Sequence, residues 1–173
     1  MKSGKVTKEH YAYKKNGSCS LLAAIEPLTG KRIAKVFDYR RKKEYATFMN
    51  LIANQYPDAT KIRIVQDNLN THNASSFYEN FPASKAFELT QRFEFYYTPL
   101  SASWLNMIEI EFSALARQCL NSRIPTKELL EKKVLTLVKE RSDKKIKINW
   151  QFSLDKARDK MIRHYKNVHL EKL

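Results

Sequence analysis

Residues 62–72 read IRIVQDNLNTH, and this stretch decides the fold class. Ile62–Val65 is short, apolar and β-branched, which predicts a buried strand. The strand runs almost directly into Asp67 and Asn68. In open α/β sheets, sites form beyond the carboxyl ends of strands, so a carboxylate here is expected to project into a crevice. The same two residues also suit a plain Asx turn, and the stretch alone leaves both interpretations open.

Further strands and helices are predicted on both sides of this stretch. Upstream, Ser20–Glu26 and Ile33–Tyr39 flank a Pro/Gly turn, which predicts a β-hairpin, and Arg40–Tyr56 has an apolar helical period. Downstream, one strand is predicted at Phe93–Tyr97, with helices at Ser75–Phe81, Ser103–Asn121, Thr126–Arg141 and from Ser153 to Tyr165. Helices that follow strands indicate a mixed α/β domain. We expect a basic arm over residues 1–16 and one domain over residues 17–173.

Composition narrows the class of partner. The chain has 173 residues and a formal net charge of +14. Lysines and arginines concentrate in residues 1–50 and 123–173, while residues 51–122 are slightly acidic. This excess favours nucleic acid as the partner, although a basic protein without such a partner has the same composition. No apolar run approaches a membrane span, and two distant cysteines fit a reducing cytosol rather than a disulfide framework.

A second carboxylate lies where a loop enters a helix. Residues 99–109 read PLSASWLNMIE, and Glu109 falls in the first turns of the predicted helix, beside its apolar stripe. We therefore expect Glu109 to face the sheet, whereas Glu111 lies on the other side of the stripe. A helix N-terminus also favours a carboxylate through its dipole alone, so this stretch too has a purely structural interpretation.

Taken together, the segments resemble bacterial insertion-sequence transposases of the mariner superfamily, specifically the insertion sequence 630 group. The resemblance covers about residues 11–165 in order. Its motifs are residues 13–17, 28–31, 67–72, 97–99, 103–109, 117–120, 150–152 and 157–160.

The resemblance implies a fold and a chemistry. The fold is α/β, an RNase H-like mixed sheet flanked by helices, here lacking the first, central strand. Asp67 matches the second acidic residue of the Asp-Asp-Asp/Glu triad, and Glu109 matches the last. Two Mg²⁺ or Mn²⁺ ions held by such carboxylates activate the attacking water or 3′-hydroxyl and stabilise the leaving oxygen. Asn68, His72 and Asn106 lie in the matched motifs and are expected to position the carboxylates or the DNA.

The first Asp of the family pattern has no match in this chain. Glu26 and Asp38 are the acidic residues that could replace it, but they lie on what the pattern predicts as the second and third strands of the family's sheet rather than the first. The family's helix-turn-helix region also has no counterpart here. The chain is therefore expected to be inactive alone: the downstream product of a frameshifted gene, a decayed remnant, or one half of a split enzyme. A non-catalytic fragment that binds DNA or transposase is the alternative.

The expected partners follow from the same resemblance. They are transposon-end and target DNA, the upstream half of the transposase or the full-length transposase, and a second copy in a homodimer, with no membrane. We expect the protein in the bacterial cytoplasm, on the nucleoid when bound to DNA. Two basic clusters are candidates for DNA-backbone contacts: Arg40, Arg41, Lys42 and Lys43 in one, and Lys144, Lys145 and Lys147 in the other. Each is equally consistent with a solvated surface.

Overall fold

The computed structural model describes residues 17–99 and 102–170, with side chains described up to residue 162. The expected arm at residues 1–16 lies outside this part. In chain order the elements are β1 (Ser20–Ile25), β2 (Arg32–Phe37), α1 (Lys42–Gln55), β3 (Ile62–Gln66), α2 (Ser75–Asn80), α3 (Ala83–Arg92), β4 (Phe93–Tyr97), the 3-10 turn η1 (Ser103–Leu105), α4 (Ile108–Gln118), α5 (Lys127–Asp143) and α6 (Leu154–Leu170). The mixed α/β class, the hairpin and the strand at residue 62 are thus confirmed.

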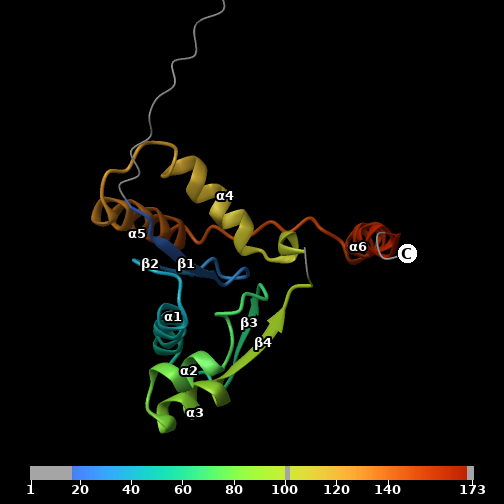
Figure 1. The fold of residues 1–173 in the computed structure, drawn as a ribbon. Helices are drawn as coiled ribbons and strands as arrows, with labels where there is room; N and C mark the ends of the chain where they lie inside the picture. Colours follow the sequence, from blue (N-terminus) through green and yellow to red (C-terminus); the bar gives the residue numbers. More distant parts are fainter. Residues whose placement is uncertain (1–16, 100–101, 171–173) are drawn as a thin grey trace, which may run out of the picture.

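The strands form two separate two-stranded sheets (Figure 1). β1 and β2 pair antiparallel, with Ser20 opposite Phe37 and Ile25 opposite Arg32. β3 and β4 pair in parallel, with Ile62 opposite Phe93. In the described part of the chain β1 and β3 do not pair with each other.

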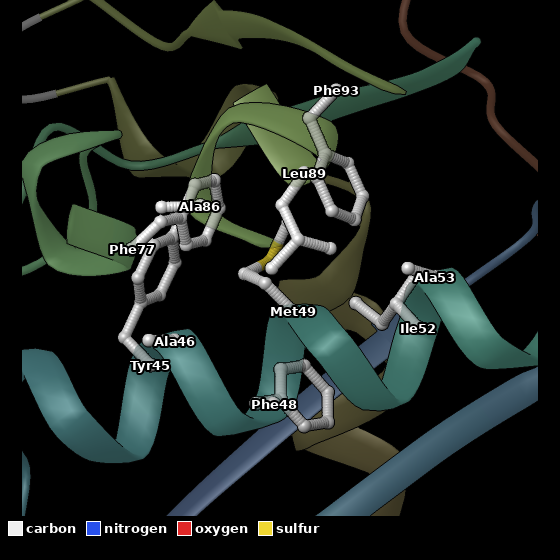
Figure 2. Packing of buried hydrophobic residues seen from close by; sticks show 10 residues of the cluster. All are labelled: Tyr45, Ala46, Phe48, Met49, Ile52, Ala53, Phe77, Ala86, Leu89 and Phe93. Carbon is white, nitrogen blue, oxygen red and sulfur yellow. The ribbon is translucent and has the colours of Figure 1, made fainter. Parts of the chain in front are cut away.

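Helix α1 builds the larger core. Its buried residues pack against the hairpin, α2, α3 and β4 (Figure 2). The buried members are Tyr45, Ala46, Phe48, Met49, Ile52, Ala53, Phe77, Ala86, Leu89 and Phe93. Side chains of β1 and β3, such as Leu22 and Ile64, also pack against this cluster, so both sheets contribute to the larger core.

The smaller core covers the opposite face of the hairpin. Ala34 of β2 packs with Leu115 of α4 and with Val134 and Val138 of α5. At its edge Glu111 of α4 is 1% exposed and lies between two arginines of other elements. Arg32 Nε is 2.9 Å from Glu111 Oε1, and Arg141 donates to both carboxylate oxygens at 2.8 and 3.2 Å. This ion-pair triad ties β2, α4 and α5 together.

One predicted helix is wrong in its extent, and one helix of the structure was not predicted. The predicted helix over Ser103–Asn121 is broken: η1 ends at Leu105, and α4 runs only from Ile108 to Gln118. The break falls at Asn106, whose backbone is extended, with φ −84° and ψ 115°. The side-chain oxygen of Asn106 accepts from the Ile108 N–H at 3.3 Å. Helix α3 was not predicted, because Ala86 and Leu89 are its only fully buried residues.

The C-terminal segment returns to η1 before α6. Trp104 of η1 packs on Phe152 with ring centroids 4.9 Å apart, and Trp150 contacts the same ring at 6.1 Å. Lys160 of α6 lies 4.2 Å above the Trp104 ring. Both tryptophans therefore act as packing anchors that hold the segment after α5 beside the loop that precedes α4.

Candidate active site

A cavity of about 490 Å³ lies between the two sheets. β1 and β3 form its sides, with residues 20–25 and 63–66 in the lining. α1 forms its floor through residues such as Phe48 and Met49, and residues 105–109 with Phe112 cover it from the α4 side. Asp67, His72, Asn106 and Glu109 all line this one cavity. Segments 42 positions apart in the sequence thus contribute carboxylates to the same space.

Asp67 is held by a histidine. Its Oδ1 lies 2.6 Å from Nδ1 of His72, while the Asp67 side chain remains 44% exposed. Among the described residues the carboxylate thus bonds to a ring rather than to a backbone N–H, so an Asx turn does not account for it. The bond engages one carboxylate oxygen and leaves the other for a ligand in the cavity.

His72 is itself held by Tyr45 and Gln66, in addition to its bond with Asp67. Its ring stacks on Tyr45 with centroids 4.7 Å apart, and its backbone oxygen accepts from Gln66 Nε2 at 2.9 Å. The Tyr45 hydroxyl donates to Gln66 Oε1 at 2.9 Å. Burial raises the pKa of Tyr45 well above its ordinary value, so this hydroxyl stays protonated and remains a donor.

Sequence reasoning missed Tyr45 and Gln66 as part of the site. Tyr45 belongs to the regular apolar stripe of α1, where nothing distinguishes it from an ordinary core residue. Gln66 stands directly before Asp67 in the stretch that decides the fold, and a buried amide at the end of an apolar strand is the one signal that marks it.

Glu109 lies at the opposite rim of the cavity. The expectation that it faces the sheet is wrong in part: the residue lines the cavity but is exposed to solvent, in the first turn of α4. Glu111, two positions on, is the buried carboxylate. The Arg32 and Arg141 guanidiniums surround it. Burial alone would raise the pKa of Glu111, but hydrogen bonds from these arginines outweigh that effect and hold the pKa below its ordinary value. Glu111 is therefore committed to the fold, and Glu109 is the carboxylate available to a ligand.

Other acidic and polar candidates do not join the cavity. Asn68 is exposed and is not part of the lining. Glu26 accepts from the Tyr56 hydroxyl at 3.1 Å, beyond the last residue of β1. Asp38 pairs with Lys127 at 2.7 Å. Neither Glu26 nor Asp38 is thus in a position to supply a third carboxylate.

The first basic cluster lies at the cavity end that holds Asp67. Arg40 is exposed and belongs to the lining. Arg41 stacks on the Tyr39 ring at 3.9 Å, Lys42 pairs with Glu79, and Lys43 is exposed.

The second basic cluster is distant from the first. Its backbone at Lys145 and Ile146 packs against Gly30 in the turn of the hairpin, the far end from Arg40. Gly30 has φ +80°, and a Cβ there would meet the Ile146 oxygen at 2.8 Å. Lys144, Lys145 and Lys147 are exposed, and Lys144 pairs with Glu140 at 2.5 Å. These three lysines do not belong to the Asp67 end.

The donor set suits a hard divalent cation in part. Carboxylate oxygens are the ligands that Mg²⁺ and Mn²⁺ take, and Asp67 and Glu109 offer them from two sides of one cavity. Within the described part of the chain, no group of three or more His, Cys, Asp or Glu residues is arranged to hold a metal ion. The cavity thus offers a divalent cation two carboxylates.

Comparison with known proteins identifies a family. The model of one protein family, the DDE superfamily endonucleases, matches residues 1–131. No curated protein and no solved structure matches the chain. None of the helices in the described residues has both the length and the apolar character needed to cross a membrane.

Proposed function

The chain belongs to the DDE superfamily endonuclease family, and from this membership we propose that it is the downstream part of a metal-dependent DNA transposase. The finer assignment, to the insertion sequence 630 group of the mariner superfamily, rests on the ordered motifs of residues 11–165. The single observation that carries the proposal is that Asp67 and Glu109, the two residues matched to the triad, line the same cavity.

The proposed roles follow from the surroundings of each side chain. Asp67, oriented by His72, and Glu109, at the first turn of α4, hold the divalent ions from two sides. When bound, two such ions activate the attacking oxygen and stabilise the leaving oxygen of an in-line phosphoryl displacement. Asn106 fixes the start of α4 and so positions Glu109, while Tyr45 and Gln66 keep the His72 ring in place. Asn68, exposed beside Asp67, is left to contact DNA.

We further propose that the fold is the RNase H-like one with its central position vacant. The antiparallel pair β1–β2 and the parallel pair β3–β4 are what remains of such a sheet when the strand between β1 and β3 is removed. That strand carries the first Asp of the family triad. The chain alone is then inactive, because two carboxylates of three do not hold the ion pair.

DNA is the proposed substrate. The exposed guanidinium of Arg40 and the ammonium of Lys43 lie at the Asp67 end, where they suit the phosphates of a transposon end or target. Lys144, Lys145 and Lys147 are far from this end and suit a second DNA segment. An enzyme of this bacterial group that acts on DNA is proposed to lie in the cytoplasm, on the nucleoid when bound to DNA. Transposition requires two DNA ends to be held together, and this requirement favours a homodimer.

Mn²⁺ broadening of backbone NMR signals tests the metal site. We expect selective broadening at residues 67–72 and 106–109, because a paramagnetic ion relaxes only nearby nuclei. Asp67→Asn and Glu109→Gln should each abolish it. Asp58→Asn is the matched control, since Asp58 is an exposed carboxylate that does not line the cavity. Broadening centred elsewhere, or unchanged by both site variants, would contradict the assignment.

A second candidate function is a non-catalytic module that binds DNA. The net charge of +14 favours it, as does the presence of only two triad-matched carboxylates at the cavity among the described residues. Binding should weaken steeply with salt, and replacing Arg40 and Lys43 with Gln should lower the slope of log K against log salt by about 0.9 for each phosphate that the protein no longer neutralises. Strand cleavage in Mg²⁺ by this chain alone would exclude the non-catalytic function. We expect none.

A further inference from the structure

An exposed aromatic ring lies beside the first basic cluster. Tyr39 is 55% exposed and belongs to the short connection between β2 and α1. β2 ends at Phe37, which pairs with Ser20, a residue of the cavity lining. Arg40, directly after Tyr39, also lines the cavity. Tyr39 is therefore at the cavity end that holds Asp67.

The Tyr39 ring is held in place although it is exposed. The guanidinium of Arg41 covers one face of the ring, 3.9 Å from the ring centroid. The backbone N–H of Arg41 donates to Glu44 Oε2 at 2.9 Å, and Asp38, on the other side of the ring, pairs with Lys127 at 2.7 Å. Because the residues on both sides are anchored, the ring loses little freedom when a flat ligand binds to it.

The surroundings of the ring suit a nucleotide. Arg41 covers one face, so the exposed area of Tyr39 offers the other face to a second flat group. Arg40 and Lys43 are exposed nearby in the chain and present positive charges to the phosphates of a DNA strand. Nucleobases stack on aromatic rings within positively charged surfaces, and arginine adds a cation–π contribution to such contacts.

A stacking surface of this kind favours an unpaired base. Inside a duplex both faces of a base are covered by its neighbours, whereas an unpaired nucleotide turns outward and offers a face to a side chain. Tyr96 is an exposed tyrosine with the opposite surroundings. Its hydroxyl bonds to Glu94, whose negative charge repels phosphates. Charge therefore favours Tyr39 over Tyr96 as the ring that meets DNA.

We propose that Tyr39 stacks on an unpaired nucleobase of the DNA strand whose phosphates lie on Arg40 and Lys43. The chain then binds DNA with unpaired nucleotides beside the cavity more tightly than fully paired duplex. The inference rests on the proposed function for DNA as the ligand, but stacking needs neither a metal ion nor strand cleavage. Tyr39 lies in none of the motifs that carry the family resemblance.

Fluorescence anisotropy with the full chain in EDTA tests the stacking, with a labelled oligothymidine of about twelve nucleotides as the probe. We expect Tyr39→Ala to weaken binding of this single strand by about 5- to 100-fold. Tyr39→Phe should bind like the wild type, because stacking needs the ring and not the hydroxyl. The slope of log K against log salt should stay the same in Tyr39→Ala, since no phosphate contact is lost.

Phe87→Ala is the matched control and should bind the single strand like the wild type. Phe87 is 57% exposed and lies on α3, whose Arg92 bonds to the Ala53 and Tyr56 oxygens at the opposite end of α1. The duplex of the same oligothymidine with its complementary strand separates stacking from charge. Tyr39→Ala and the wild type should bind this duplex equally.

Four outcomes would overturn the proposal. They are no binding of the single strand, unchanged binding of it by Tyr39→Ala, equal losses for single strand and duplex, or a loss in Tyr39→Phe as large as that in Tyr39→Ala.

The Mn²⁺ experiment distinguishes this proposal from the proposed function. Weaker single-strand binding by Tyr39→Ala without Mn²⁺ broadening at Asp67 would keep the stacking and refute the metal site. Broadening at Asp67 with no effect of Tyr39→Ala would do the reverse.

Discussion

Replacing Glu111 and Glu109 by glutamine, one at a time, should separate folding from function within a single helical turn. Glu111 is 1% exposed and lies between Arg32, which is 7% exposed, and Arg141. Glu111→Gln leaves two guanidiniums facing a neutral amide in a dry site. Removing one partner of a buried ion pair costs about 3–5 kcal/mol, and we expect the lower end because the Arg141 side chain retains some exposure.

Glu109→Gln is the matched control. Glu109 is exposed in the first turn of the same helix, where loss of its favourable interaction with the helix dipole costs about 0.3–1 kcal/mol. Urea unfolding followed by far-UV circular dichroism at pH 7 measures both variants. We expect Glu111→Gln to lower the free energy of unfolding by about 3 kcal/mol and Glu109→Gln to lower it by at most about 1 kcal/mol. Mn²⁺ binding should show the opposite pattern, with the larger loss in Glu109→Gln. A loss below about 1 kcal/mol for Glu111→Gln would refute the reasoning that the triad depends on its charge.

The remaining predictions concern pH, a hydrogen bond, a turn and the core. The arginines hold the pKa of Glu111 below its ordinary value of 4.5, so the ionised carboxylate stabilises the fold fully above pH 4.5. This stabilisation is lost as the pH falls through the lowered pKa. The difference in free energy of unfolding between the wild type and Glu111→Gln should therefore become smaller when urea titrations are repeated at acid pH. Tyr45→Phe leaves the buried Gln66 oxygen without its donor and should lower the free energy of unfolding by about 1–3 kcal/mol in urea titrations, whereas Tyr78→Phe, at an exposed side chain, should not change it. Gly30→Ala places a residue with a Cβ at a left-handed φ, and this Cβ meets the Ile146 backbone. Calorimetry should therefore show a lower Tm, by several degrees for each 1 kcal/mol of stability lost. An unchanged Tm would mean that the turn is not constrained as described. Phe77→Ala, at a side chain with no exposure, should cost about 3–5 kcal/mol in urea titrations, and a cost below about 1 kcal/mol would contradict its place in the larger core.

Most of the elements could be predicted because their patterns are local. The alternation around the Pro/Gly turn predicts the hairpin, and the period of Tyr45, Phe48, Met49 and Ile52 predicts α1. The break at Asn106 could not be predicted in this way, because the apolar stripe continues across the extended backbone of this residue.

The carboxylates of the candidate site could be predicted from the sequence, but the residues that hold or distinguish them could not. Asp67 follows almost directly after a short apolar, β-branched run, so its position at the end of a strand can be recognised from the local sequence alone. The choice between Glu109 and Glu111 depends on Arg32, whose contact with α4 spans 79 positions and has no local signature. The role of Tyr45 is equally hidden, since it arises from a contact with His72 across a turn and a strand.

The division of the molecule into two cores has a consequence for the order of assembly. Both sides and the floor of the cavity come from the contiguous residues 20–97, whereas its cover needs α4, held against the hairpin by α5. Closing that cover joins distant positions, as in the bond from the Arg32 N–H to the Ser142 hydroxyl, 110 residues apart. Contacts at such separation form late, after local ones have been made. On a growing chain Asp67 therefore reaches its final place early, and Glu109 joins it only once the ribosome has released α5.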